Sequence, residues 1–410
     1  MAIIKDVAKI NERSIGKSFP FQEIEYIDID SVNEGIISKP KKICLSEAPS
    51  RARRIVRVND IIISTVRPNL RHFAFIKNVS LNTVVSTGFA VVTPTKIEAA
   101  YLYYFLSTEK YTNFLSAIAE SHTSTYPSFN PDIIENSTIP LPPKQEQYAI
   151  AKILSDLDSK IELNEQMNKT LEAIGQALFK HWFIDFEFPN EQGKPYKSSN
   201  GKLIHSEPGF IPASWTVKTL REVSSELVRG FTTDYVKKSQ TINLNQKVNR
   251  GPYLDKSNYK FYPDDTIIPK EKFARFGDIL INSLGQGTLG RVHLFLETVS
   301  NVVIDQHISI VRPLKDFLAE YLYFFLTDSA SQLRLHANVT GSTGMQMLNI
   351  SMIRNFKIIL PEEKIIQRYS KFVSNLFLLK QRNILESEKL AEIRNALLPK
   401  LMSGQIRVPV

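Results

Sequence analysis

The stretch Tyr101-Leu102-Tyr103-Tyr104-Phe105-Leu106 decides the fold, because it recurs almost unchanged as Tyr321-Leu322-Tyr323-Phe324-Phe325-Leu326. Two other segments recur in the same order: Asp-Ile-Ile-Ile-Ser at 60–64 returns as Asp-Ile-Leu-Ile-Asn at 278–282, and Leu-Pro at 141–142 returns at 360–361. The offset stays between 218 and 220 residues, which is about half the chain and far longer than a solenoid period. The sequence therefore predicts a protein built from two similar halves.

Each half is predicted to begin with a mixed part of short strands and one helix. The β-rich runs are separated by clusters of Gly, Pro, Asn and Ser, as strands in a compact domain are. An aromatic-rich helix is expected after them, at about 99–118 in the first half and 316–335 in the second.

A long helix is predicted to end each half, at about 145–181 and 364–400. Each starts just after a Leu-Pro pair, and proline can precede a helix but cannot continue one. Between the halves, a stretch rich in Gly, Ser, Pro, Asn and Lys is predicted to be a linker. The expected order is a first mixed domain at 1–143, a central long helix at 144–186, a linker at 187–210, a second mixed domain at 211–360, and a distal long helix with a C-terminal tail at 361–410.

The two long helices carry the same stripe at seven-residue spacing, with asparagine in the middle. The predicted seam residues are Ile150, Leu157, Asn164, Leu171 and Leu178 in the first helix and Tyr369, Leu376, Asn383, Leu390 and Leu397 in the second. Sustained heptads are typical of coiled-coil pairing. The alternative is two amphipathic helices buried separately, but neither half offers enough surface to cover so long a stripe.

The seam asparagines predict the direction of pairing. Asn164 and Asn383 are the midpoints of their stripes, so an antiparallel pair places them side by side, where their amides can hydrogen-bond and fix the register. Lys380 lies in the inner stripe of the second helix and predicts looser packing there. The predicted fold class is α+β, with two similar mixed α/β domains, two long antiparallel coiled-coil-like helices and a pseudo-two-fold internal repeat.

Composition excludes several classes of protein. The chain has 410 residues with 51 Lys+Arg against 42 Asp+Glu, a net charge of +9, and 43% hydrophobic residues, which is a globular composition. No apolar run reaches the 20 residues of a membrane span, and no secretory signal is expected. One cysteine, Cys44, excludes internal disulfides and a cysteine-based zinc site. We therefore expect a cytoplasmic protein.

Signatures of catalysis are missing from the sequence. There is no phosphate-binding P-loop, and Gly285-Gln286-Gly287-Thr288-Leu289-Gly290 lies between two β-like runs, so it is predicted to be a loop rather than a dinucleotide site. The seven histidines show no metal-ligand spacing, and His307 beside Asp305 is interpreted as a half-buried strand histidine. We expect no catalytic residue, no metal and no cofactor.

Basic residues mixed with small polar residues favour nucleic-acid contacts, because Arg suits guanine, Gln suits adenine, and Ser and Thr suit either. A solvated basic face is the alternative for each cluster alone. Two domains on a two-fold spacer strengthen the DNA interpretation, since duplex DNA offers half-sites one helical turn apart. The predicted DNA-contacting residues are Arg51, Arg53, Arg54, Arg67, Arg71, Thr123, Thr125, Arg229, Thr233, Gln286, Thr288, Arg291, Ser342, Thr343 and Gln346.

The chain resembles the specificity subunit of Type I restriction–modification enzymes. Four segments carry the resemblance, together with the duplicated layout of essentially the whole chain: Ile-Pro-Leu-Pro-Pro-Lys-Gln-Glu-Gln at 139–147, Ala-Leu-Phe-Lys-His-Trp-Phe-Ile-Asp-Phe at 177–186, Ile-Pro-Ala-Ser-Trp at 211–215, and Leu-Pro-Lys-Leu-Met-Ser-Gly at 398–404. The first half lacks a counterpart of the Ile-Pro-x-x-Trp entry, so the start of its recognition domain is undefined.

The resemblance implies a division of labour. Two target recognition domains would each read one half of a split double-stranded DNA sequence, and the paired helices would set the spacing. The helices' outer faces and the segment 182–186 are candidates for docking two methyltransferase subunits, which recruit restriction subunits. S-adenosylmethionine would bind the partner, and this chain would have no active site.

Two rival functions stay open at the level of sequence. One is a two-headed scaffold that binds proteins, and the other is a DNA-modifying enzyme with an unrecognised site. The missing cofactor and metal motifs argue against the enzyme. A steep salt dependence of DNA binding would separate a DNA reader from a protein scaffold.

Overall fold

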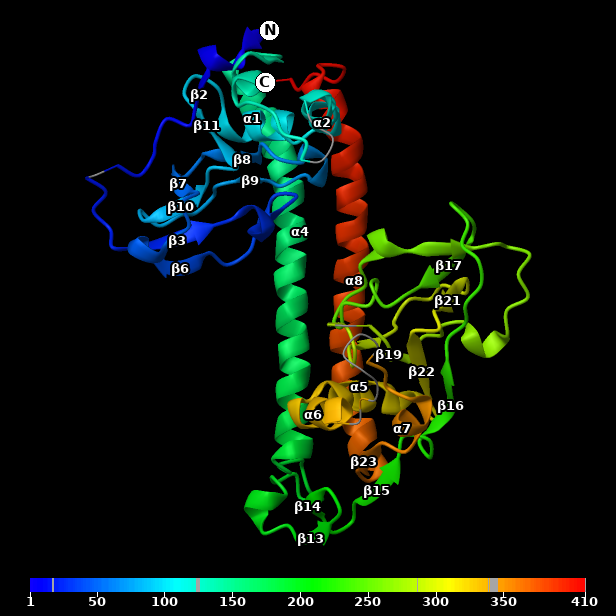
Figure 1. The fold of residues 1–410 in the computed structure, drawn as a ribbon. Coiled ribbons are helices and arrows are strands. Elements are labelled where there is room, and N and C mark those ends of the chain that lie inside the picture. Colours follow the sequence, from blue (N-terminus) through cyan, green and yellow to red (C-terminus); the bar gives the residue numbers. More distant parts are fainter. Residues whose placement is uncertain (17, 123–125, 286, 338, 340–345, 410) are drawn as a thin grey trace. The chain divides into compact units, whose positions relative to one another are not determined.

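The computed structural model describes the whole chain except residues 17, 123–125, 286, 338, 340–345 and 410 (Figure 1). It divides into two compact units. The first unit consists of Met1–Leu163 and Glu386–Val410, and the second of Asn164–Leu385. The helices α4 (Lys144–Phe179) and α8 (Glu363–Met402) contribute residues to both.

The first unit is built on two four-stranded sheets. One has the order β2-β11-β8-β9 and is antiparallel, and the other has the order β6-β3-β10-β7, in which β3 and β10 run parallel. Two short pairs, β1–β12 and β4–β5, complete it. The strands are β1 (Ala2–Ile3), β2 (Ala8–Ile10), β3 (Glu23–Ile27), β4 (Val32–Asn33), β5 (Ile36–Ile37), β6 (Lys41–Cys44), β7 (Ala52–Ile55), β8 (Ile61–Ser64), β9 (Phe73–Phe75), β10 (Thr83–Ser86), β11 (Phe89–Pro94) and β12 (Thr138–Ile139).

Where one aromatic-rich helix was predicted, the first unit has two: α1 (Ala99–Leu106) and α2 (Glu109–His122). The prediction of a single helix at 99–118 is wrong because the hydroxyls of Ser107 and Thr108 donate to the carbonyls of Tyr104 and Phe105, an alternative to helical bonding that ends α1. A short helix α3 (Asp132–Glu135) follows.

The second unit repeats this architecture. Its sheets have the orders β16-β22-β19-β20 and β18-β17-β21, with β17 parallel to β21, as β3 is to β10. Two antiparallel pairs, β13–β14 and β15–β23, are added. The strands are β13 (Leu203–Ser206), β14 (Gly209–Pro212), β15 (Thr216–Thr219), β16 (Ser224–Arg229), β17 (Thr241–Leu244), β18 (Lys260–Tyr262), β19 (Ile279–Asn282), β20 (Val292–Leu294), β21 (Val302–Ile304), β22 (Ile308–Pro313) and β23 (Lys357–Leu360).

The second aromatic-rich helix is also split. A 3-10 turn (Asp316–Leu318) leads into α5 (Ala319–Thr327), and α6 (Ser329–Ala337) starts after Asp328, whose carboxylate accepts from the backbone N–H of Ala330. The expected single helix at 316–335 is therefore wrong too, because the Asp328 carboxylate caps a new helix start. A short α7 (Ile350–Arg354) precedes β23.

The stretch predicted to be a linker at 187–210 is structured instead. Phe188 is buried and stacks between the rings of Tyr196 and Trp215, with centroids 4.6 and 5.1 Å away. The hairpin β13–β14 follows. Aromatic side chains spread through a Gly- and Ser-rich segment supply enough apolar burial to hold it.

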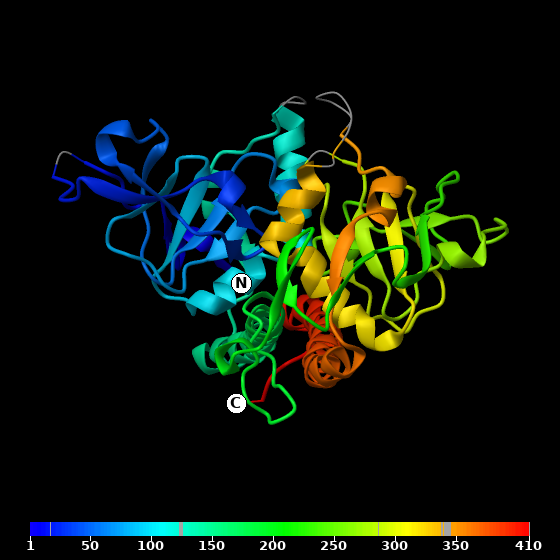
Figure 2. The ribbon, with the colours of Figure 1, turned by 90° about the horizontal axis from the view of Figure 1, so that it is seen from below.

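The helices pair antiparallel within each unit. In the second unit the segments of α4 and α8 lie side by side, seen end-on in Figure 2, and Lys380 contacts Glu172. In the first unit Asp158 of α4 meets Arg394 of α8. Each of the ten seam residues is buried or half-buried. Pro399 lies inside α8, against the expectation for proline, but only one turn before the end at Met402, where the loss of one hydrogen bond is tolerated.

The antiparallel register places the two seam asparagines together, as predicted. The Asn164 side-chain amide donates to the backbone carbonyl of Asn383 at 3.4 Å, and the Asn383 amide donates to Asn168 Oδ1 at 3.0 Å. These two bonds join the paired helices at the seam asparagines. The ammonium of Lys380 is buried and pairs with Glu172.

Candidate nucleic-acid interface

In the first unit, the loop that follows β8 is joined to the segment before α3. The backbone N–H of Arg67 donates to the carbonyl of Pro127 at 2.7 Å, and that of Phe129 donates to Thr65 at 3.0 Å. Arg67 has a φ of 49°, which turns the chain sharply at the strand end. Its guanidinium lies 4.9 Å from the centroid of the exposed Tyr126 ring. A cation stacked on an exposed aromatic ring is a surface suited to phosphates and bases.

The second unit joins the equivalent loops in the same way. The backbone N–H of Leu348 donates to Ser283 at 2.9 Å, and Leu284 pairs with Met347 across an isolated bridge. The Arg229 guanidinium donates to the carbonyl of Leu348 at 2.7 Å. The end of β16, the loop after β19 and the segment before α7 therefore meet at one place.

The described part of the glycine-rich stretch 285–290 is a loop between β19 and β20, as predicted. Gly285, Gly287 and Gly290 all have positive φ, a backbone that glycine adopts without strain. The side chains of Thr288 and Arg291 donate within this loop: Thr288 Oγ1 donates to the carbonyl of Gly285 and Arg291 Nη2 to that of Gly287. The side chain of Gln346 is exposed beside it.

Other predicted contact residues make contacts within the fold or lie on another sheet. The Arg71 guanidinium donates to the Ser107 carbonyl at the end of α1 and pairs with Glu34. Arg51 precedes β7, while Arg53 and Arg54 belong to it, in the sheet that does not carry the β8 loop. Thr233 is half-buried after β16. Five predicted residues lie outside the described part of the chain: Thr123, Thr125, Gln286, Ser342 and Thr343.

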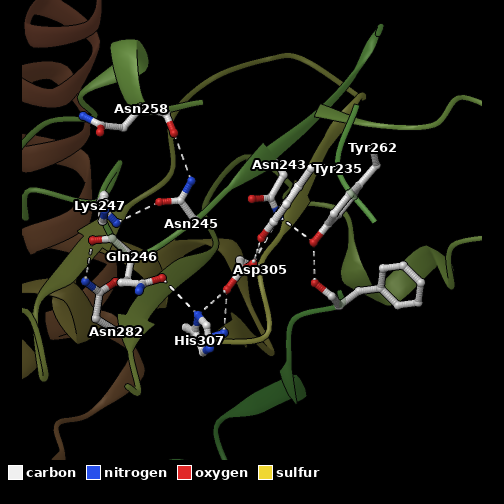
Figure 3. A network of polar contacts seen from close by, with 11 residues as sticks. Tyr235, Asn243, Asn245, Gln246, Lys247, Asn258, Tyr262, Asn282, Asp305 and His307 are labelled. Carbon is white, nitrogen blue, oxygen red and sulfur yellow. Dashed lines mark hydrogen bonds and ion pairs between the residues drawn. The ribbon is translucent and has the colours of Figure 1, made fainter. Parts of the chain in front are cut away.

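A polar network lies beside the second unit's loops (Figure 3). Its centre is Asp305, a 1% exposed carboxylate that accepts from Tyr235, Asn243 and His307. Burial, with the charge of Asp305, raises the pKa of Tyr235 to about 12, so the phenol stays a donor. The Tyr262 hydroxyl accepts from Asn243 and donates to the carbonyl of Phe231, which ties the loop after β16 into the network.

His307 is not in a strand, contrary to expectation. It lies in the tight turn between β21 and β22, and its side chain is 32% exposed. Its Nδ1 lies 3.0 Å from Asp305 Oδ1 and 3.1 Å from Gln246 Oε1. The only signal in the sequence was a histidine two residues after an aspartate that ends an apolar run, which also fits ordinary turns.

The described residues contain no group of three or more His, Cys, Asp or Glu side chains placed to hold a metal ion. Nor is any of the helices they form both long and apolar enough to cross a bilayer.

The chain is a duplicated α+β protein. Polar loops are joined at equivalent strand ends of its two repeats, and two long helices run through both, which is the architecture of a two-part recognition protein. Comparison with known proteins is more specific. The chain belongs to the family of the Type I restriction modification DNA specificity domain, whose profile matches residues 2–173 and 212–395. The resemblance found in the sequence is thereby confirmed, and the protein is a Type I restriction–modification specificity subunit with two DNA specificity domains.

Individual relatives match over nearly their full lengths. The chain is 27% identical to the Type I restriction enzyme HindI specificity subunit of Haemophilus influenzae, over 96% of this chain and 97% of that one. It is 28% identical to the MjaIX specificity subunit of Methanocaldococcus jannaschii, over 94% and 84%. The crystal structure of a Type I restriction-modification S subunit from M. genitalium has the same fold, with a TM-score of 0.55 at 13% identity over 98% of this chain and 95% of that one.

Proposed function

We propose that this chain reads a bipartite double-stranded DNA sequence, one half-site through the joined loops of each unit, and that it has no active site of its own. The observation that carries the proposal is the recurrence of the loop pair. In the first unit the loop after β8 is hydrogen-bonded to the segment before α3, and in the second unit the loop after β19 is hydrogen-bonded to the segment before α7. Polar side chains gathered on loops over a rigid sheet are suited to base edges and phosphates.

The helices supply the proposed spacing and the docking of partners. Because α4 and α8 contribute to both units, their length sets the separation of the half-sites in this proposal. Apolar side chains are exposed along α8 in the second unit, with Phe372 62%, Leu378 53% and Leu385 57% exposed. An apolar stripe open to water favours a protein partner, here the two methyltransferase subunits, through which restriction subunits join. Trp182, another candidate for docking, is buried at 6% and packs in the core of its own unit.

The test is methylation mapping in cells that carry this chain with its methyltransferase partner. We expect one split motif that changes when this chain is replaced. Methylation or cleavage by the purified chain alone would overturn the assignment of no active site. DNA binding by the assembled complex that does not respond to salt would instead favour a protein scaffold.

Two arginines test the loop assignment directly. Arg67→Ala and Arg291→Ala should each weaken DNA binding by the assembled complex, because each removes a charge from a joined loop. Arg221→Ala is the matched control: Arg221 is exposed at the other end of β16, and its loss should leave binding unchanged. Equal affinity and equal motif for all three variants would refute the assignment.

A further inference from the structure

The network around Asp305 fixes the orientation of two side chains at its edge, His307 and Gln246. Asp305 is held by four contacts on its two oxygens: Tyr235 and Asn243 on Oδ2, at 3.2 and 3.5 Å, and the backbone N–H and Nδ1 of His307 on Oδ1, at 2.9 and 3.0 Å. A buried carboxylate with this many donors is satisfied and rigid. It therefore orients whatever it binds.

Asp305 fixes the orientation of the His307 ring, and His307 in turn fixes the orientation of the Gln246 amide. His307 Nδ1 faces a carboxylate oxygen that can only accept, so Nδ1 carries the hydrogen. The same Nδ1 lies 3.1 Å from Gln246, and an N–H requires the amide oxygen on that side. Among the described contacts, the opposite ends of both groups, Nε2 of His307 and the NH2 of Gln246, take part in no hydrogen bond; Figure 3 shows the contacts between Asp305, His307 and Gln246.

These two side chains adjoin the loops already assigned to DNA. The backbone N–H of Ser283 donates to the carbonyl of His307 at 2.8 Å, and the Asn282 amide donates to the carbonyl of Gln246 at 3.1 Å. A side chain at Gly285 would begin only 3.4 Å from Gln246 Cγ. The pair and the loop therefore form one continuous surface in the second unit.

In the described part of the first unit, no side chain occupies the position equivalent to His307. Its counterpart of the Ser283–His307 bond joins Thr65 to Gly88 at 2.8 Å. Gly88 has no side chain, and a Cβ there would lie 2.6 Å from Ile29 Cδ1. Among the described residues, the polar pair therefore occurs in one repeat only. A role in holding the fold that both repeats share would not explain this difference, but recognition of two different half-sites would.

Resting on the proposed function, the geometry points to Gln246 and His307 as a pre-oriented pair that reads the major-groove edge of one purine in the half-site of the second unit, with Asp305 as their positioning residue. Purines place N7 next to an exocyclic group on this edge, so one base can engage two neighbouring side chains. The Gln246 NH2 donates to N7. In the tautomer with its hydrogen on Nδ1, His307 accepts from the adenine amino group through Nε2.

The test is the methylated motif of the assembled complex with His307→Ala, Gln246→Ala and Asp305→Asn. All three should relax the same one or two base pairs of a single half-site, with discrimination there falling roughly 5- to 100-fold. The other half-site and the gap should be unchanged. His205→Ala, at an exposed histidine on β13 of the same unit, is the matched control and should leave the motif intact.

The outcomes separate this inference from the proposed function. A motif that depends on this chain but is identical in all three variants overturns the inference alone. So does relaxation in both half-sites, or an equal effect of His205→Ala. Relaxation confined to one position cannot come from general unfolding, which would lower methylation of the whole motif. Methylation that does not depend on this chain at all defeats the proposed function instead.

Discussion

Replacing Lys380 by methionine should destabilise the second unit, although the lysine looks out of place in a helix seam. Its side chain is 8% exposed and its ammonium lies 2.5 Å from Oε2 of Glu172, which is 17% exposed. Tyr323 donates its hydroxyl to the other oxygen of Glu172 at 2.5 Å. Methionine keeps most of the apolar stem but leaves the carboxylate without its cation.

The size of the destabilisation depends on the contacts that Glu172 keeps after Lys380 is replaced. Removing one partner of a buried pair costs about 3–5 kcal/mol in free energy of unfolding. Because Glu172 keeps the Tyr323 bond and some access to water, we expect about 2–3 kcal/mol. In a unit of this size that is a fall in Tm of roughly 4–12 °C. The double variant Lys380→Met with Glu172→Gln should recover to within about 1 kcal/mol of the parent, since it has no unpaired charge.

Tryptophan fluorescence reports this transition selectively. Both tryptophans, Trp182 and Trp215, are buried in the second unit. Lys371→Met is the matched control, because Lys371 is exposed on the same helix. A Lys380→Met variant that melts like Lys371→Met, or a double variant less stable than Lys380→Met alone, would refute the reasoning.

Three other perturbations have outcomes that the structure decides. Gly175→Ala should destabilise the second unit by about 1–3 kcal/mol despite alanine's better helix propensity, because the new Cβ would lie 2.5 Å from the buried Phe324 ring; a higher fluorescence Tm would contradict this. Burial lowers the pKa of His293 to about 4, so its contribution to stability is complete above the unfolded pKa near 6.5 and is lost as pH falls toward 4, by about 3 kcal/mol; denaturant titrations at several pH values should show this slope, and His293→Gln should flatten it. Inserting one heptad into both α4 and α8 adds about 10 Å, so methylation mapping should find a gap longer by roughly three base pairs with both half-sites intact, whereas altered half-sites would count against the helical spacing.

The repeat made most of the architecture predictable. Collinear segments at one offset predict two similar units whatever their details, and the unit sheets do share one strand order around the parallel pairs β3–β10 and β17–β21. The heptad stripe with a central asparagine predicted antiparallel pairing, because only that direction brings the two midpoints together. Helix ends and breaks were less predictable, since Ser107, Thr108 and Asp328 act through local hydrogen bonds that compete with an otherwise strong helical pattern.

The candidate site was predictable only in part. Arg67, Arg229 and Arg291 stood out by composition, and the structure puts each at a joined loop. Composition could not distinguish them from Arg71, whose guanidinium is bound to Ser107 and Glu34. Gln246 was missed, and His307 was interpreted as a strand histidine, because the two are 61 residues apart and neither lies in a basic or glycine-rich run.

The sequence by itself determined the duplication, the two long helices, their antiparallel register and the family, because these depend on periodicity and on matches along the chain. Only the tertiary structure decided which polar side chains lie together on one surface and which are paired with each other in the interior. Lys380 shows the difference: its place in the stripe does not reveal that a carboxylate from α4 and a tyrosine from α5 meet there, so that its buried charge is paired. Such compensation depends on atoms brought together from distant segments, and no local pattern in the sequence encodes it.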